Sequence, residues 1–526
     1  MIITNLALRC SPEQVEFYLV DFKKGVEFKC YGSRRLPHAK VVAIESDREF
    51  GLSVLQRVDD ELRRRGDLFR RVGAQDLAGY KRAGGPEPVP RTLLMIDEFQ
   101  EFFTEEDRVS QGAAVLLDRI VRQGRAFGIH VLLGSQTLGG AYTLARATLG
   151  QMVIRIALQC NEADAYLIMD QDNPAPRLLS RPGEGIYNDA AGAMEGNSPF
   201  QAVWLSDRTR DNYLAQVRTR ADQCGNLYPG PIVFEGNAPA EVRENLLLVE
   251  LLKTAKARRG AGVPPAGSET PGREARATIW LGAPNSIKGP TEARFQRQSG
   301  SHLLVVGQSE ERTATLLSVA FVALVAQYPK GGVELVVLDS TPAGFPQRAM
   351  LDRLVQASPQ TATPGGNANL AEIMGALGGE WKRRADNEAS GPEIFVLIQG
   401  LQNFKKLRQE DEFSYSSSSG DGPTPAGTLM SLLTEGPARG IHLIITADTY
   451  NNVSRFLGRK ALTEFEMRVV FQMSASDSAS LIDAPAAATL GLHRALLYND
   501  REGSLETFRP YAQPGADWVE EVIQSW

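Results

Sequence analysis

The stretch that decides the fold is RTLLMIDEF, residues 91–99. Its apolar centre has the length and composition of a buried strand. Similar runs follow the same pattern at 15–21, 129–135 and 152–158, and these are also expected to be buried parallel strands. Between them, residues 48–72 and 113–125 have helical spacing and many charges. Alternation of this kind predicts an α/β domain with a mostly parallel sheet.

The second half of the chain repeats the first half. Five segments match in order: 16–21 with 334–339, 93–98 with 395–400, 128–133 with 440–445, 155–159 with 468–472, and 187–189 with 498–500. The separation stays nearly constant, which predicts two copies of one domain in tandem. We expect a first domain at 1–235, a linker at 236–277 and a second domain at 278–526. Residues 278–300 are expected to form a ribbon entering the second domain.

Composition narrows the class of protein. The net charge of −6 and pI of about 5.7 exclude a globally basic nucleic-acid binder, although a ring with a basic pore remains possible. The arginine runs 63–65 and 70–71 share a helix with acidic residues, so a solvated or subunit-facing surface is expected. The four cysteines lack metal-ligand spacing and indicate a reducing compartment. No apolar run is long enough to cross a membrane. We therefore expect a cytoplasmic protein that reaches the inner membrane face only through a partner or further sequence.

The strongest candidate site is the carboxylate pair Asp97 and Glu98 at the end of the strand. In nucleotide-hydrolysing α/β domains, such a strand end places the first carboxylate on the Mg²⁺ shell and the second on the attacking water. The carboxyl ends of parallel strands are also where such sheets bind ligands. The alternative is that the pair only caps the following helix.

Other polar residues are expected near this edge. Gln136 follows the next strand, where an amide can sense a γ-phosphate or orient water; it could equally be a turn residue. Lys23 and Lys24 follow the strand that ends at Asp21, with the same alternative. Three arginines, Arg119, Arg122 and Arg125, precede the strand at 129–135. One could act as an arginine finger on a neighbouring subunit, or all three could form a solvated basic face.

The second copy lacks this chemistry. Its segment GQSEERTA, residues 307–314, lies where a G-x-x-x-x-G-K-[ST] phosphate loop would be, but Arg312, Thr313 and Ala314 replace the glycine, lysine and hydroxyl. Gln399 with Gly400 replaces the carboxylate pair, and Asp448 replaces Gln136. We predict that the second domain keeps the fold without hydrolysing nucleotide.

Four stretches carry a family resemblance: YLVDFKKGVEF (18–28), LMIDEF (94–99), GRAFGIH (124–130) and SQT (135–137). They resemble the FtsK/SpoIIIE-type translocase ATPases. Tandem domains with degenerate later copies resemble the multi-domain branch that includes the type VII secretion motor ATPase. The resemblance implies RecA-like P-loop NTPase-type domains, ATP with Mg²⁺, and homo-hexameric rings or domain stacks that move DNA or protein through a pore.

The family pattern assigns roles to four residues. Asp97 and Glu98 match the Walker B pair, which would make Asp97 the metal-binding residue. Gln136 matches the sensor-type polar residue beside the nucleotide. Arg125 matches the arginine before the Gly-Ile-His strand, and the resemblance implies that it acts in catalysis.

One part of the family pattern is missing. Neither copy has a Walker A loop with its phosphate-holding lysine, and residues 2–8 read as the helix that should follow this loop. We expect the sequence upstream of codon 1, in frame, to encode a strand and a Gly-Lys-Ser or Gly-Lys-Thr loop. Three functions stay open: a motor translocating double-stranded DNA, an ATPase module of a type VII-like protein secretion motor acting on a secreted protein substrate, and a non-catalytic fragment that retains only the fold.

Overall fold

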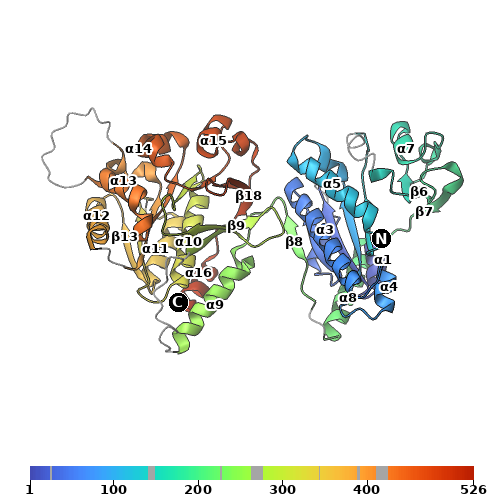
Figure 1. Ribbon diagram of the computed structural model, residues 1–526, viewed down its shortest axis with the longest axis horizontal. Coiled ribbons are helices and arrows are strands. Elements are labelled where there is room, and N and C mark those ends of the chain that lie inside the picture. Colours follow the sequence, from blue (N-terminus) through green and yellow to red (C-terminus); the bar gives the residue numbers. More distant parts are fainter. Residues whose placement is uncertain are drawn as a thin grey trace. The chain divides into compact units, whose positions relative to one another are not determined.

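The chain divides into two compact units, Met1–Asn237 and Ala238–Trp526 (Figure 1). The computed structural model describes residues 1–23, 27–139, 148–225, 228–261, 277–342, 344–387, 391–409 and 424–526. Lys24 and residues 262–276 of the expected linker lie outside the described residues. No helix within the described ranges is both long and apolar enough to cross a membrane.

The first unit contains the predicted parallel sheet. Its five strands lie in the order β4-β3-β1-β2-β8 and all pair in parallel. Their bounds are β1 Val15–Asp21, β2 Ala39–Ile44, β3 Arg91–Asp97, β4 Ile129–Leu133 and β8 Ile232–Glu235. Helices α3 (Arg48–Arg71) and α5 (Arg108–Gln123) lie side by side (Figure 1). Helices α1 (Ile2–Arg9) and α8 (Asp207–Gln223) pack together with β1 in a separate apolar cluster.

The remaining elements of the first unit are short. Among the described residues they are α2 Lys29–Ser33, α4 Leu77–Arg82, α7 Glu162–Ile168, the 3₁₀ helices η1 Phe99–Phe103, η2 Ala175–Leu178 and η3 Met194–Gly196, and the strands β5 Arg155–Leu158, β6 Glu184–Asn188 and β7 Asn197–Gln201.

The expectation of a buried parallel strand at 152–158 was wrong. Strand β5 belongs to a separate three-stranded sheet, where it pairs antiparallel with β6. Two of its four side chains are open to solvent; Ile156 is 48% and Leu158 54% exposed. In the second unit the corresponding strand, Met467–Val470, is buried because a further parallel strand, Leu303–Val306, joins it to the rest of the sheet. Among the described residues of the first unit, no strand joins β4 to β5.

The second unit is built on one ten-stranded mixed sheet in the order β10-β9-β18-β17-β16-β11-β15-β14-β12-β13. The strand bounds are β9 Ala277–Pro284, β10 Thr291–Phe295, β11 Leu303–Val306, β12 Val333–Asp339, β13 Thr361–Gly365, β14 Glu393–Gln399, β15 Ile441–Ala447, β16 Met467–Val470, β17 Ala495–Asn499 and β18 Ser504–Pro510. The predicted ribbon at 278–300 is confirmed as the antiparallel pair β9 and β10.

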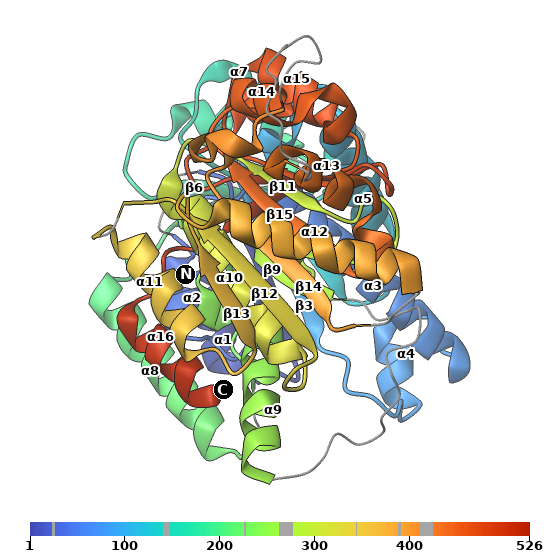
Figure 2. The same ribbon diagram turned by 90° about the vertical axis from the view of Figure 1, so that its left-hand side faces the viewer.

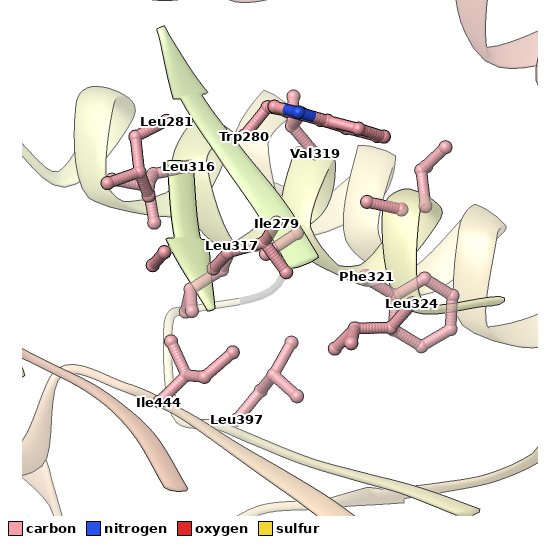
Figure 3. Packing of buried hydrophobic residues seen from close by; sticks show 14 of the residues in the cluster. Ile279, Trp280, Leu281, Leu316, Leu317, Val319, Phe321, Leu324, Leu397 and Ile444 are labelled. Carbon is pink, nitrogen blue, oxygen red and sulfur yellow. The ribbon is translucent and has the colours of Figure 1, made fainter. Parts of the chain in front are cut away.

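Two helical layers cover the faces of this sheet. Helix α10 (Glu310–Gln327) is almost entirely buried on one face, where Leu317 and Phe321 point toward Leu397 and Ile444 of the sheet (Figure 3). Helix α12 (Leu370–Asn387) lies over the other face (Figure 2). The other helices are α11 Pro346–Ala357, α13 Pro425–Glu435, α14 Tyr450–Leu462, α15 Ala475–Ile482 and α16 Ala516–Ser525.

Part of the expected linker is ordered helix. Residues 246–261 form α9, which contacts α10 and α16 of the second unit. Leu248 of this helix is buried in the core of that unit. The division into compact units likewise places every residue from Ala238 onward in the second unit.

The two units share a strand order and a register. The order β4-β3-β1-β2 corresponds to β15-β14-β12-β13. Asp21 pairs with Asp97 at the ends of β1 and β3, and Asp339 pairs with Gln399 at the ends of β12 and β14. The central parallel strands therefore end at the same level in both units.

A buried arginine on one helix also corresponds between the units. Arg65 on α3 binds Glu61 at 2.7 Å and donates to the carbonyl oxygen of Phe127. Arg384 on α12 binds Glu380 at 2.7 Å and donates to the carbonyl oxygen of Arg439. The expectation of a solvated surface was wrong for Arg65, which is 0% exposed because buried acceptors satisfy its guanidinium.

Candidate active site

The carboxyl ends of β1, β3 and β4 meet at one edge of the first sheet. Asp21 ends β1, Asp97 ends β3, and Gln136 follows β4 shortly after Leu133. The predicted residues Asp97, Glu98 and Gln136 are therefore together, as expected for neighbouring parallel strands. The alternative role of the pair, capping the next helix, is not what the side chains do. Glu98 stands at the cap position of η1 but makes no side-chain cap hydrogen bond.

Glu98 has a backbone conformation that glutamate rarely adopts. Its φ of 51° and ψ of 48° lie in the left-handed region, and the residue is 4% exposed. A non-glycine residue there costs about 1–2 kcal/mol. Gly400, at the same place in the second unit, has φ of 70° and ψ of 70°. The turn therefore requires a left-handed residue, and the first unit keeps a strained glutamate there. Strain of this kind concentrates at functional sites.

A polar network holds the Glu98 carboxylate. Lys23 Nζ donates to Glu98 Oε1 at 3.3 Å and to Gln136 Oε1 at 2.7 Å. Gln100 Nε2 donates to the other oxygen, Oε2. Ser135 Oγ in turn donates to Gln100 Oε1 at 2.7 Å. The carboxylate is thus fixed from two sides, and the Gln136 amide is tied to it through Lys23.

Two members of this network were missed from the sequence. Ser135 lies within a quoted stretch and Gln100 directly follows another, but their residue types alone signal no role. Lys23 was placed at this edge, and its contacts now favour a site residue over a simple turn residue.

The site is rich in negative charge. Burial raises the pKa of Asp21 to about 6, with further contributions from Asp97 and Glu98. Burial also raises the pKa of Asp97, aided by the neighbouring Glu98 carboxylate. The Asp21 Oδ2 atom is buried and has no hydrogen-bond partner. A divalent cation would relieve both the repulsion and the unpaired oxygen.

The residues present fit Mg²⁺ better than a closed protein metal site. Among the described residues, no group of three His, Cys, Asp or Glu side chains could hold a metal ion. Mg²⁺ needs only one or two protein carboxylates, because waters and substrate phosphates complete its shell. Space beside Asp97 is kept by Gly134, where an added Cβ would lie 2.6 Å from Asp97 Oδ1. Asp97 and Asp21 are the carboxylates that would hold the ion or its waters.

Arg125 is not part of this edge. It lies in the turn between α5 and β4, at the amino ends of the parallel strands. There it lines a cleft with Arg91 and Arg122. Arg119 pairs with Asp59 at 2.9 Å, and Arg122 pairs with Asp118 at 2.8 Å. None of the three predicted arginines therefore forms an ion pair with Asp97 or Glu98 of its own unit in the described residues.

The corresponding edge of the second unit is closed by neutral hydrogen bonds. Gln399 Nε2 donates to Thr313 Oγ1, and Thr446 Oγ1 donates to Gln399 Oε1, both at 3.1 Å. Thr446 occupies the position of Gly134, so the space beside the strand end is filled. Glu310 and Asp448 line the cavity of about 240 Å³ that remains. These carboxylates disfavour phosphate there, in agreement with the expected loss of chemistry.

Comparison with known families addresses the first unit directly. Residues 1–139 match the FtsK/SpoIIIE family. This range contains Asp97, Glu98, Arg125 and Gln136, and the resemblance stated from the sequence is confirmed.

Two relatives illustrate the range of this family. The chain is 30% identical over 214 residues to the ESX-5 secretion system protein EccC5 of Mycobacterium tuberculosis (strain ATCC 25618 / H37Rv), covering 39% of this chain and 14% of EccC5. It is 26% identical over 260 residues to the DNA translocase FtsK of Streptococcus pneumoniae (strain ATCC BAA-255 / R6), covering 46% of this chain and 30% of that FtsK. The chain thus spans well under half of either relative.

Solved structures match the fold across both units. The cytoplasmic domain of the Thermomonospora curvata type VII secretion ATPase EccC has a TM-score of 0.63 at 18% identity, covering 100% of this chain and 60% of that chain. ATPases 2 and 3 of EssC from Geobacillus thermodenitrificans have a TM-score of 0.55 at 14% identity, covering 97% and 88%. The predicted fold, two RecA-like P-loop NTPase-type domains, is confirmed.

Proposed function

We propose that the first unit binds and hydrolyses ATP with Mg²⁺ as part of an FtsK/SpoIIIE-type motor. The observation that carries the proposal is Glu98, held in a strained left-handed conformation beside Asp97 by Lys23 and Gln100. Bound Mg²⁺ would neutralise charge on the transferred phosphate. In this proposal Asp97 holds the metal, and Glu98 accepts a proton from the attacking water. Gln136 senses the γ-phosphate of the nucleotide or orients the water.

The test is Mg²⁺-dependent ATP hydrolysis by the natural polypeptide that carries residues 1–526. Turnover should require Mg²⁺ and should fall at least about 100-fold in Asp97→Asn, because the amide cannot replace the anionic ligand. Asp67→Asn is the matched control, since Asp67 is an exposed carboxylate that pairs with Arg70 on α3. Absence of Mg²⁺-dependent turnover in the parent polypeptide would refute the proposal.

We propose double-stranded DNA as the transported polymer, supported by the similarity to DNA translocases named FtsK. The second candidate is a secreted protein substrate, favoured by the 30% identity to EccC5. Stimulation of ATP hydrolysis distinguishes them. A DNA duplex should raise turnover in the first case. Only a substrate protein should raise it in the second.

We further propose that the motor is a homo-hexamer. Arg125 lies at the sheet edge opposite Asp97, so it could contact a nucleotide only on a second copy. Light-scattering masses with and without a non-hydrolysable ATP analogue test this, and a monomer under both conditions would contradict it. The proposed location is cytoplasmic, supported by the likeness to a domain described as cytoplasmic.

The second unit is proposed to be a non-catalytic copy of the first. A duplication is supported by the shared strand order and by the shared register at the strand ends. It is also supported by the corresponding hydrogen bonds of Arg65 in the first unit and Arg384 in the second. We propose that the second domain begins before α9, since that helix packs in its core.

A further inference from the structure

Lys23 is a charged residue of the carboxylate edge to which the proposed hydrolysis assigns no chemical role. It follows β1, and its Nζ atom donates to Glu98 Oε1 at 3.3 Å and to Gln136 Oε1 at 2.7 Å. The three residues follow three neighbouring strands of the sheet, β1, β3 and β4. Lys23 therefore joins the residue proposed to accept the proton of water to the residue proposed to lie near the γ-phosphate.

The turn that carries Lys23 is fixed, whereas its side chain is accessible. The Lys23 N–H donates to Asp21 Oδ1 at 2.9 Å. The Lys23 side chain is 53% exposed, and the Glu98 side chain that it contacts is 6% exposed. A lysine carries its ammonium group on a flexible four-carbon stem with three rotatable donors. The ammonium group can therefore leave Glu98 for another anion at this edge without a change in the backbone.

The second unit keeps this turn without the lysine. Thr341 N donates to Asp339 Oδ1 at 2.7 Å, which is the counterpart of the hydrogen bond made by the Lys23 N–H. Thr341 lines the cavity of the second unit together with Gly400, which replaces the glutamate. The turn therefore does not need a lysine for its conformation. The second unit lacks the lysine and the glutamate together, which indicates that the two side chains act together in the first unit.

A phosphate group at this edge needs a positive partner. Asp21, Asp97 and Glu98 lie close enough that their mutual repulsion contributes to the raised pKa of both aspartates. Within the part of the chain that the structure describes, Lys23 supplies the one ion pair to these three carboxylates. Its side chain is therefore the protein cation placed to offset the repulsion between the carboxylates and a phosphate.

We propose that Lys23 binds the γ-phosphate of the nucleotide and that, without nucleotide, it is held on Glu98. The inference rests on the proposed ATP hydrolysis at the same edge and adds a control to it. An ammonium group binds a phosphate oxygen through a charge-assisted hydrogen bond. The γ-phosphate would draw Lys23 Nζ away from Glu98, so that the carboxylate would be released to accept a proton only when a triphosphate is bound. ADP has no γ-phosphate and would leave Lys23 on Glu98.

Nucleotide binding by the natural polypeptide tests the proposal. A non-hydrolysable ATP analogue and ADP are titrated, each with Mg²⁺, into the parent and into Lys23→Met, which keeps an unbranched side chain and removes the charge. The substitution should weaken binding of the analogue at least about tenfold and should leave ADP binding within about threefold of the parent. Lys23→Arg keeps the charge and should retain most of the preference for the analogue over ADP.

The matched control is Lys29→Met. Lys29 is 48% exposed and pairs with a carboxylate away from the site, Glu235, at 2.7 Å. Its substitution should change the binding of neither nucleotide.

Chemical acetylation of lysines, followed by mass spectrometry, gives a second measurement that needs no variant. Lys23 should react at least about fivefold more slowly with the ATP analogue bound than with ADP bound, because only the analogue brings a phosphate to its amine. Lys29 should react at the same rate with either nucleotide. Equal rates at Lys23 with the two nucleotides would contradict the proposal.

Mg²⁺-dependent turnover of the parent is measured on the same preparation, so that the two proposals can fail separately. Turnover together with an unchanged nucleotide preference in Lys23→Met would overturn this inference and leave the proposed hydrolysis standing. Equal weakening of the analogue and ADP would also overturn it, because Lys23 would then only support the shape of the edge. A preference that depends on Lys23 without any turnover would support the inference and refute the hydrolysis. A parent that binds neither nucleotide would overturn both.

Discussion

The ends of β3 and β14 have the same register and the same left-handed turn, yet they carry different chemistry. In the first unit the turn residue is Glu98, and the adjoining space is kept open beside Gly134. In the second unit the turn residue is Gly400, and Thr446 bonds to Gln399 across the same space. In the second unit, where the carboxylates are absent, the turn residue is a glycine that adopts the left-handed conformation without strain, and Gln399 is hydrogen-bonded to Thr313 and Thr446. The comparison teaches that the fold does not require the carboxylates, because the second unit keeps the same strand order and register with Gln399 and Gly400 at the strand end.

The largest expected effect comes from removing the Glu98 charge. Glu98→Gln should lower ATP turnover at least about 100-fold while ATP binding is retained, because the isosteric amide cannot accept the proton of water. Steady-state turnover and equilibrium binding are measured on the natural polypeptide. Glu106→Gln, at an exposed position on the loop after η1, should leave both unchanged. Turnover of Glu98→Gln within about threefold of the parent would remove Glu98 from this role.

The second unit should fail to bind ATP with Mg²⁺. Thr313, Gln399 and Thr446 satisfy one another, and Glu310 lines the cavity where phosphate would lie. Calorimetric titration of the compact unit Ala238–Trp526 should show no saturation below about 1 mM. Micromolar binding would show that the second unit has a working nucleotide site, so that the two units would not differ in nucleotide binding.

Gly134→Ala should lower turnover about tenfold or more, because a displaced ligand loses the reacting geometry. The added Cβ would lie 2.6 Å from Asp97 Oδ1 and would push the carboxylate away. Gly66→Ala is the control, since its Cβ would meet only Phe127 at 3.8 Å. Equal turnover in the two variants would show that the space beside Asp97 is not needed.

The smallest effect concerns backbone strain. Glu98→Ala and Glu98→Gly both remove the carboxylate and differ only in the Cβ atom. The glycine variant should be more stable to unfolding by about 1 kcal/mol, because only glycine adopts the left-handed turn without strain. Urea unfolding of the two variants measures the difference. If the alanine variant is equally stable, Glu98 is not strained. The free energy of unfolding would then not distinguish the turn at Glu98 from the turn at Gly400.

Several predictions from the sequence follow from local patterns. Apolar runs that end in polar residues predicted β1, β3 and β4, and the carboxyl-edge rule then predicted the meeting of Asp97, Glu98 and Gln136. The ELRRRGD and EWKRRAD segments at 61–67 and 380–386 also match, a signal that was overlooked. It would have linked Arg65 to Arg384 and indicated a shared buried role.

Other features depended on neighbours distant in sequence. Arg65 is buried because Glu61, Thr92 and Phe127 supply its acceptors. Helix α9 lies in the expected linker because its side chains find a core in the second unit. The antiparallel pairing of β5 depended on β6, and no property of residues 152–158 alone distinguishes this pairing from a parallel one.

By itself, the sequence determined strands β1, β3 and β4 and their shared edge, and it predicts a repeat whose second copy lacks phosphate-loop chemistry. These depend on residue type and spacing, which local conformational preference and hydrophobic periodicity translate into structure. Only the tertiary structure decided that Lys23 joins Glu98 to Gln136, that Glu98 is strained, and that Arg125 lies at the opposite edge with Arg91. Those facts depend on which chain segments meet in three dimensions, and a side chain's partners and conformation are set by that meeting rather than by its neighbours in sequence.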